Sequence, residues 1–232
     1  QAKAYFNLGV VFDDSGQYKK AIDSYGKALK IEPNYIDALY NQAITLKTVG
    51  EFSKSESNLR KCLEANSNHQ DAINALAIVL LKKGDVESSI EFCDERLALQ
   101  PNDALTLNNL GLALKQNGDL DKAKDAFYSA LENNPLFAEA HCNLSTINVV
   151  STDAKIVELA KQAHQEVNSD HELMLMEFTL GKIHKDLRQF KSAFDFFASA
   201  NNRKLKSLNW SRPDYSQLAN SLLKVNEKLS QA

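Results

Sequence analysis

Apolar residues recur along this chain at intervals of three and four, and short polar segments separate the runs. A period between three and four residues is that of an amphipathic α-helix. Gly16 interrupts the first run and Pro33 ends the second, so the pattern predicts two helices joined by a short turn. The apolar positions that define these two helices are Tyr5, Leu8, Phe12, Tyr18, Ala21, Tyr25 and Ala28.

The same pattern returns 34 residues further along the chain, and then twice more. The residues equivalent to Gly16 are Gly50, Gly84 and Gly118. Regular repetition of one helix–turn–helix unit predicts a solenoid, in which each unit packs only on its neighbours. The four regular copies are expected over residues 2–35, 36–69, 70–103 and 104–137.

Residue types within each copy fit this unit. The first helix carries a small residue (Gly9, Ala43, Ala77 or Gly111), and the second carries a larger one in three copies (Tyr25, Leu59 and Phe127). We expect the two helices to approach closely at these positions. The turn glycines are expected to end the first helix in the left-handed conformation, and Asp85 and Asp119 to cap the second. Pro33, Pro101 and Pro135 cannot continue the second helix.

The last part of the chain follows the pattern less closely. A fifth, degenerate copy over 138–171 has Ser-Thr-Asp in place of the turn glycine, and its second helix is expected from about Lys155 to Val167. A sixth copy over 174–207 comes two residues late and has Arg188 at the turn. A linker and a capping helix are expected over 208–232, which would complete a single domain over 1–232.

The repeated positions resemble the tetratricopeptide repeat at nearly every signature residue. The resemblance implies an all-α fold, a right-handed superhelix (α-α solenoid) of about six helix–turn–helix repeats plus a C-terminal capping helix. It also implies a protein–protein interaction scaffold that binds a peptide or partner protein in its concave groove. In this family the first helix of each repeat lines that groove.

Asparagine recurs at the sixth position of the first helices. This row resembles the asparagine ladder in the repeat domain of the O-linked N-acetylglucosamine transferase. Each side-chain amide offers a donor and an acceptor, so a row of them could hold an extended peptide by its backbone. The alternative is that these asparagines are solvated helix residues without a ligand. The predicted peptide-binding residues are Asn7, Asn41, Asn109 and Asn143, with Asn74 beside the interrupting Ala75 and Thr179 in the last copy.

A second binding mode of the family, the carboxylate clamp of chaperone adaptors, is excluded by residue type. The clamp needs Lys and Asn in one repeat and Lys and Arg two repeats later. Here Phe6 and Val10 occupy the first pair of positions, and Asp71 and Ala75 the second. These residues offer no fork of positive donors to an anionic terminus.

Composition narrows the function classes further. The chain has 232 residues, 44% of them hydrophobic, with a net charge of -3 from well-mixed acidic and basic residues. This balance argues against nucleic acid as a partner, and no apolar run is long enough to cross a membrane. Three cysteines on apolar helical stripes (Cys62, Cys93 and Cys142) suit core positions and a reducing, cytoplasmic location. Self-association through exposed terminal repeats is a further possibility.

Catalysis is not expected within these residues. The five histidines are scattered, no metal-ligand spacing occurs, and "LGK" at 180–182 lacks the glycine spacing of a phosphate loop. No cofactor or metal is therefore predicted.

One segment suggests an enzyme beyond this chain. Residues 178–207 resemble the junction in bacterial proteins where tetratricopeptide repeats precede a sulfotransferase domain. The resemblance rests on Phe178, Leu180–Lys182, Asp186–Leu187, Ala193–Phe194, Ala200–Asn201 and Arg203. It implies the alternative function of a substrate-recruiting domain in a larger sulfotransferase or other transferase, with the catalytic domain beyond residue 232.

Overall fold

The computed structural model describes residues 1–147 and 154–207, and every helix or strand assigned among them is an α-helix. This confirms the all-α prediction; the expected capping helix lies outside the described residues. In chain order the helices are α1 (Ala2–Asp14), α2 (Tyr18–Ile31), α3 (Ile36–Thr48), α4 (Phe52–Ala65), α5 (Gln70–Lys83), α6 (Val86–Leu99), α7 (Ala104–Asn117), α8 (Leu120–Asn133), α9 (Ala138–Ser145), α10 (Ala154–Glu166), α11 (Asp170–Asp186) and α12 (Phe190–Ser207).

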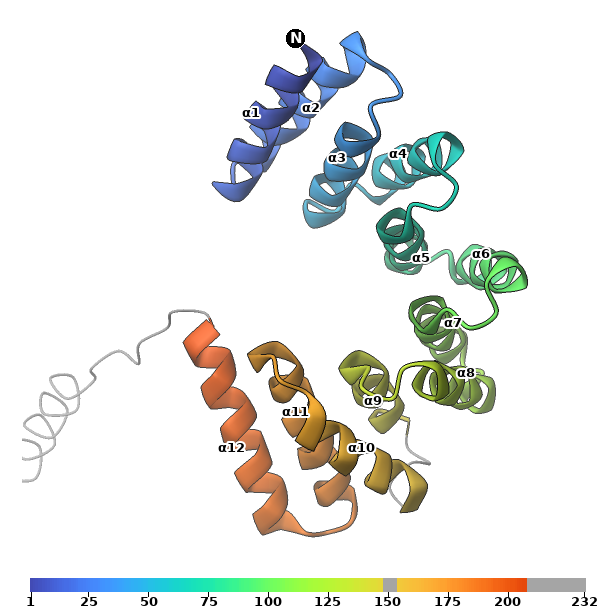
Figure 1. Cartoon of the computed structure of the whole chain (residues 1–232), viewed down its shortest axis with the longest axis vertical. Coiled ribbons are helices and arrows are strands. Elements are labelled where there is room, and N and C mark those ends of the chain that lie inside the picture. The colour runs from blue at the N-terminus through green and yellow to red at the C-terminus, as the bar shows by residue number, and fades with distance from the viewer. Residues whose placement is uncertain (148–153, 208–232) are drawn as a thin grey trace, which may run out of the picture.

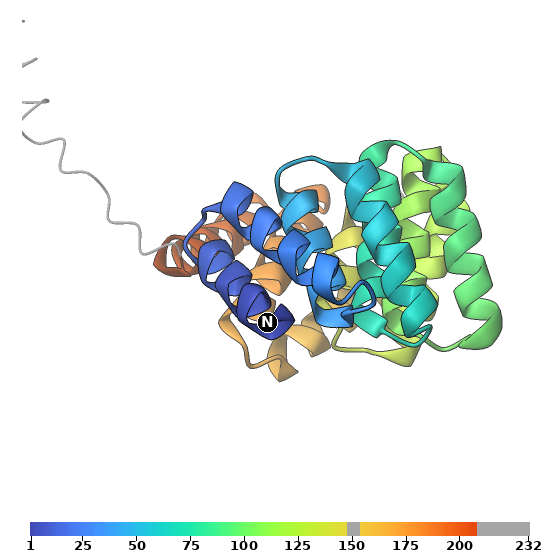
Figure 2. The same cartoon turned by 90° about the horizontal axis from the view of Figure 1, so that it is seen from above.

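The helices follow one another around an open arc (Figure 1). From α1 to α9, and again from α10 to α12, each helix packs beside the next, whereas α9 packs mainly against α11. Successive helix pairs stack side by side from α1–α2 to α7–α8, as the view from above also shows (Figure 2). Helices α3, α5 and α7 lie on the inner side of the arc, and α4, α6 and α8 lie on its outer side (Figure 1). The inner surface is therefore built from the first helices of the repeats.

Four glycines make the turns between the paired helices of repeats one to four. Their φ angles are 70° at Gly16, 84° at Gly50, 88° at Gly84 and 94° at Gly118, which confirms the predicted left-handed conformation. The two predicted caps differ. Asp85 caps α6 by accepting a hydrogen bond from the backbone N–H of Ser88, whereas the prediction for Asp119 was wrong. Its carboxylate accepts instead from the side-chain amide of Asn117.

Close contact between a glycine and an aromatic ring joins the two helices of three repeats. A Cβ atom placed on Gly9 would lie 2.5 Å from the ring of Tyr25, and one on Gly111 would lie 2.5 Å from the ring of Phe127. In the sixth repeat, a Cβ on Gly181 would lie 2.7 Å from the ring of Phe197. Repeats two and three instead have Ala43 in the same register as Leu59, and Ala77 in that of Cys93, all fully or almost fully buried. Where the first helix has an alanine in place of the glycine, the residue in register on the second helix is thus smaller than an aromatic side chain.

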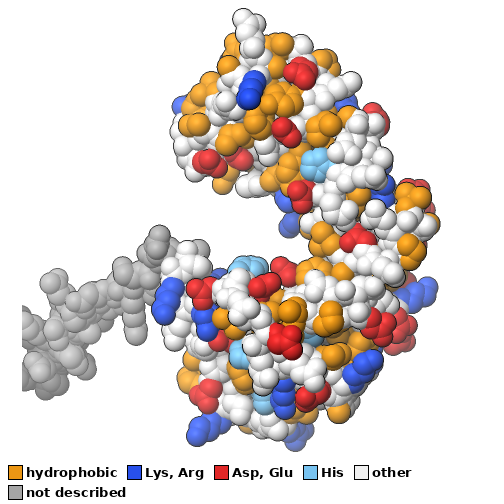
Figure 3. All heavy atoms as spheres, in the orientation of Figure 1, with side chains coloured by type: hydrophobic (Ala, Val, Ile, Leu, Met, Phe, Trp, Pro, Cys, Tyr) orange, Lys and Arg blue, Asp and Glu red, His pale blue; other side chains and the backbone are white. Residues whose placement is uncertain are grey.

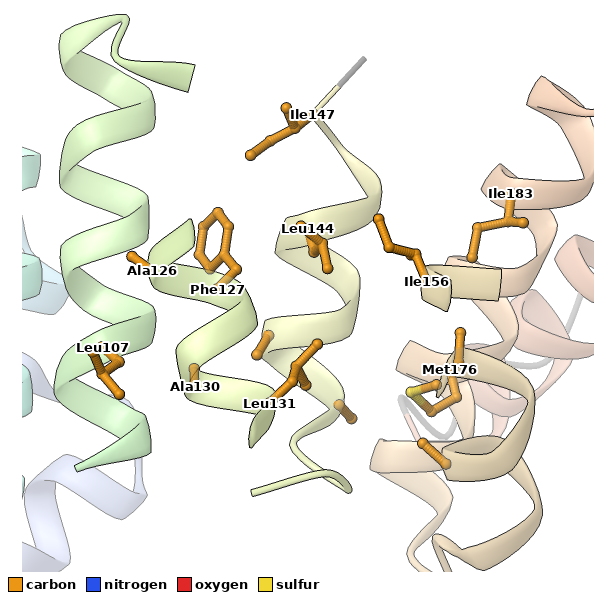
Figure 4. Close-up of a cluster of buried hydrophobic side chains, with 14 of the residues drawn as sticks. Leu107, Ala126, Phe127, Ala130, Leu131, Leu144, Ile147, Ile156, Met176 and Ile183 are labelled. Carbon is orange, nitrogen blue, oxygen red and sulfur yellow. The ribbon is translucent and has the colours of Figure 1, made fainter. Parts of the chain in front are cut away.

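Most of the buried apolar side chains belong to two clusters along the arc. One extends from Leu39 to Leu80, and the other from Leu107 to Ile183. The second crosses from α7 through α8 and α9 to α10 and α11 (Figure 4). Helix α6 lies where the clusters meet, because its Phe92 packs on the first cluster and its Ile90 on the second.

The fifth repeat departs from the regular geometry, as expected, and the sixth begins earlier than predicted. Helix α9 has only 8 residues, while α10 at Ala154–Glu166 lies within one residue of the predicted helix at both ends. Helix α11 begins at Asp170, four residues before the expected start at 174, because Ser169 and Glu172 form a capping box. At the next turn Arg188 takes the left-handed conformation of the missing glycine, with φ of 60°.

Replacing Gly111 with alanine is expected to destabilise the protein by at least about 1 kcal/mol. The new Cβ would lie 2.5 Å from the fully buried ring of Phe127, an overlap severe enough for the upper part of the usual overpacking cost, about 2–3 kcal/mol, against a gain of up to about 1 kcal/mol in helix propensity. The double variant Gly111→Ala/Phe127→Leu recreates the Ala43–Leu59 combination, so it should be more stable than the sum of the single changes predicts. Urea unfolding measures all three.

Gly26→Ala is the matched control. Gly26 lies inside α2, and an added Cβ would meet only the side-chain amide of Gln42, at 3.4 Å. This change should leave stability equal or raise it by up to about 1 kcal/mol. A Gly111→Ala protein as stable as the parent would contradict the close-contact account.

Replacing Arg188 with glycine is expected to stabilise the protein by about 0.5–1 kcal/mol. A left-handed residue with a Cβ costs about 1–2 kcal/mol, and glycine removes this cost while losing some backbone entropy. Arg188→Ala keeps the Cβ and serves as the control, so it should show no such gain in urea unfolding. Equal effects of the two changes would mean that the turn is not strained.

Candidate binding groove

A groove of about 370 Å³ lies on the inner side of the arc, across α5, α7, α9 and α11. Figure 3 shows the arc as a deep hollow between its two arms. Every lining residue comes from a first helix of a repeat or, in one case, from the residue just before such a helix. The lining residues are Asn74, Ile78, Leu105, Asn108, Asn109, Leu112, Phe137, Glu139, Cys142, Asn143 and Leu175.

Two asparagine pairs cross from one repeat to the next along this groove. The Asn109 amide Nδ2 donates to Asn74 Oδ1 at 2.7 Å, and the Asn143 Nδ2 donates to Asn108 Oδ1 at 2.9 Å. Both pairs join residues 35 positions apart, and in both the residue later in the chain is the donor. The groove therefore contains the same kind of amide pair at two successive steps of the solenoid. We call Asn74–Asn109 and Asn108–Asn143 the asparagine pairs.

Each asparagine pair leaves hydrogen-bonding capacity toward the groove. The pairing uses the oxygen of one amide and one N–H of the other, so an NH₂ group remains at Asn74 and at Asn108, and an oxygen acceptor at Asn109 and at Asn143. Asn108 and Asn109 are only 4% and 2% exposed, while Asn74 and Asn143 are half-buried. Each pair thus offers at least one donor and one acceptor, which is the complement of a peptide bond.

The structure brings together three of the five asparagines that the sequence singled out. Asn74, Asn109 and Asn143 line the groove, whereas Asn7 on α1 and Asn41 on α3 do not. Sequence reasoning missed Asn108, although it follows Asn74 at the 34-residue interval of the repeats. Thr179 is buried and donates to the Leu175 carbonyl within its own helix.

The cysteines divide between core and groove. Cys62 and Cys93 are fully buried, as predicted, and burial raises the pKa of Cys93 to about 12. Cys142 is half-buried and lines the groove, so the expectation that it is a core residue was wrong. Burial also raises the pKa of the Cys142 thiol, with an opposing contribution from its hydrogen bond with Thr179. Burial raises the pKa of Cys62 as well, so all three are neutral thiols near pH 7.

The part of the chain that the structure describes contains no group of three or more His, Cys, Asp or Glu side chains placed to hold a metal ion. In the same residues, no helix has the length and apolar character required to cross a membrane.

The basic run at the end of α12 has a packing role. Arg203 donates through Nε to both carboxylate oxygens of Glu177 at 3.1 Å, and Glu177 is only 5% exposed. The Ser199 hydroxyl donates to the same carboxylate, and Arg203 also pairs with Asp170. These contacts hold α12 against α11. Residues of the sulfotransferase-like segment thus have roles within the sixth repeat itself.

Models of the tetratricopeptide repeat match residues 2–35, 40–104 and 104–136, which is more than half of the 232 residues. The chain belongs to the tetratricopeptide repeat family. Its structure is similar to MamA from Desulfovibrio magneticus RS-1, with 25% identity and a TM-score of 0.58 over 71% of this chain and 93% of that one.

Two further solved structures share the fold. A tetratricopeptide repeat protein from Parabacteroides merdae has 17% identity and a TM-score of 0.66, with 96% of this chain and 83% of that one covered. YrrB, described as a tetratricopeptide repeat protein with an unusual peptide-binding site, has 22% identity and a TM-score of 0.52, with 71% and 86% covered.

Among curated proteins, the photosystem I assembly protein Ycf3 from Acaryochloris marina is 42% identical over 36 residues. The match covers 16% of this chain and 22% of that protein, so it extends over little more than one repeat.

Stability is expected to fall as the pH drops below about 6.5, in part because of His141. This side chain is 1% exposed, and burial lowers its pKa against a smaller opposing effect of its Nε2 hydrogen bond to the Pro135 carbonyl. The unfolded chain, with an ordinary pKa of about 6.5, therefore binds a proton before the folded one does. The contribution of His141 to stability is therefore present above about pH 6.5. It is lost as the pH falls toward the lower pKa that His141 has in the folded state.

His141→Leu tests this contribution, because Leu39 and Leu107 occupy the equivalent positions of repeats two and four. The difference in unfolding free energy between pH 7.5 and pH 5 should be smaller in the variant than in the parent. An unchanged difference would show that His141 does not carry the dependence.

Proposed function

We propose that this chain is an interaction scaffold that holds an extended segment of a partner protein in the inner groove. The observation that carries the proposal is the repeated asparagine pair. Each pair leaves at least one donor and one acceptor, and a peptide bond needs both. Two pairs in the same register would bind two peptide groups of one extended chain without reading its side chains.

The remaining lining supports the same ligand. Ile78, Leu105, Leu112 and Leu175 provide an apolar surface for side chains of the bound segment. Tetratricopeptide repeat proteins serve as protein-interaction scaffolds, and YrrB is described as having a peptide-binding site. We therefore propose a protein or extended peptide as the partner, bound without catalysis in this segment.

The recruiting domain of a sulfotransferase stays an alternative prediction, without added support. The residues that suggested it are explained by packing within the sixth repeat, where Arg203 binds Glu177 and Gly181 meets Phe197. The cytoplasmic location also stays a prediction. So does self-association, for which the first helix offers Leu8 and Val11, both exposed.

Peptide selection followed by removal of whole asparagine pairs tests the proposal. Twelve-residue peptides selected from a random displayed library on this chain provide the probe. The double variants Asn74→Ala/Asn109→Ala and Asn108→Ala/Asn143→Ala remove both partners of a pair, so neither leaves an unpaired amide. Each should weaken a selected peptide about tenfold or more, because two hydrogen bonds of about 1 kcal/mol each are lost.

Gln42→Ala/Asn58→Ala is the matched control. Asn58 Nδ2 donates to Gln42 Oε1 at 2.7 Å between α3 and α4, away from the residues that line the groove. It should leave the peptide affinity unchanged. Unchanged affinity in both groove variants, with helix content and thermal midpoint preserved, would reject the asparagine pairs as the binding site.

A further inference from the structure

Aromatic residues replace the asparagines at the groove positions of the first two repeats. Phe6 and Tyr40 occupy the positions of Asn74 and Asn108, each a whole number of repeats away. Tyr35 precedes α3 as Phe137 precedes α9, and Phe137 lines the groove. The inner face therefore continues toward the N-terminus as an aromatic surface.

These aromatic residues meet in pairs at two successive steps of the solenoid. The ring centroids of Phe6 and Tyr35 are 5.2 Å apart, and those of Tyr40 and His69 are 5.1 Å apart. Tyr40 and His69 lie 34 positions after Phe6 and Tyr35, so the second contact is the equivalent of the first in the next repeat. All four side chains are only half-buried, so parts of their rings face solvent.

A carboxylate accompanies each aromatic pair. Asp37 and Asp71 lie in the first turns of α3 and α5, two residues after Tyr35 and His69, and both are exposed. Burial contributes most to raising the pKa of Tyr35, and the negative charge of Asp37 contributes next. For Tyr40, burial again contributes most, followed by the charge of Asp71. We call this set the aromatic–acidic patch: Phe6, Tyr35, Asp37, Tyr40, His69 and Asp71.

The chain's own cations do not fill this patch. Lysine or arginine side chains lie over Phe12, Tyr5, Phe92 and Tyr128, but within the described residues none lies over a ring of the patch. In residues 1–147 and 154–207, neither Asp37 nor Asp71 has an ion-pair partner. Four other rings of the chain thus already carry a cation, while the rings and carboxylates of the patch stay open.

We propose that the aromatic–acidic patch binds a lysine or arginine side chain of the peptide held in the groove. A cation is attracted to the face of an aromatic ring and to a carboxylate, whereas an apolar side chain would gain nothing from Asp37 and Asp71. An acidic side chain would be repelled by both carboxylates. The inference rests on the proposed function, because it assigns specificity to a peptide whose backbone the asparagine pairs hold.

Basic residues lie on the same helices but at their other ends. Lys47 and Lys82 are near the C-terminal ends of α3 and α5, and each lies about ten residues, or roughly 15 Å of helix rise, from the carboxylate of its own helix. Burial and the charge of Lys82 lower the pKa of Lys47. On α3 and α5 the carboxylates and these lysines therefore lie at opposite ends of the helix, and the patch is at the acidic ends.

The same random twelve-residue library tests the patch through the composition of the selected peptides. Peptides selected on the parent chain should be enriched in Lys and Arg at least about threefold over the unselected library. Selection on Asp37→Asn/Asp71→Asn should lose this enrichment. Asp23→Asn/Asp94→Asn, which removes two exposed carboxylates from α2 and α6, should keep it.

A single substitution in one selected peptide then measures the contact. Citrulline keeps the shape of arginine without its charge, and it should weaken binding to the parent about tenfold. The loss should be at most about twofold in the Asp37→Asn/Asp71→Asn protein, since the charge has lost its partners.

The possible failures are distinguishable. Peptides that bind through the asparagine pairs but lack basic residues, or equal citrulline effects in the parent and the carboxylate variant, would overturn the patch alone. Failure to enrich any peptide above an unrelated protein would overturn the proposed function and the patch with it.

Discussion

The contact between a glycine in one helix and an aromatic ring in the next sets the spacing of the paired helices in the first, fourth and sixth repeats. At Gly9, Gly111 and Gly181 there is no room for a Cβ, because the ring from the second helix lies on the glycine backbone. A repeat protein has no central core, so each repeat must be held together by its own two helices and by its neighbours. The spacing inside a repeat therefore determines where the next first helix lies, and so the shape of the inner surface.

The groove is a consequence of this stacking. Because α5, α7 and α9 present the same face at each step, residues one repeat apart come into register, and Asn109 can reach Asn74 as Asn143 reaches Asn108. The same register places aromatic pairs at the two earlier steps. The inner surface thus changes from aromatic and acidic to amide-rich along one continuous path, near the point where α6 separates the two apolar clusters.

Much of the fold was predictable from the sequence because it depends on local rules. A turn glycine at 34-residue intervals and a helical period in between indicate the paired helices, and the structure has them at the expected places. The start of α11 was missed because the capping box of Ser169 and Glu172 prevails over the register of the repeat. Asp119 was misjudged because the neighbouring Asn117 amide competes for its carboxylate.

The groove was predictable only in part. Counting positions within one repeat identified Asn109 and Asn143, but it treated each asparagine as independent. The pairing joins residues 35 positions apart, one more than the repeat length, and this offset depends on how successive repeats stack rather than on any single repeat. Asn108 was therefore overlooked, and the exposed Asn7 was grouped with residues that line the groove.

The most direct test of the account follows the asparagine side-chain amides by nuclear magnetic resonance while a selected peptide is added. The account predicts that the NH₂ signals of Asn74 and Asn108, whose donors remain after pairing, shift on binding. The signal of Asn133 on the outer helix α8, which donates to the Ser129 carbonyl, should not move. Shifts at Asn133 or other outer asparagines, with Asn74 and Asn108 unchanged at saturation, would contradict it.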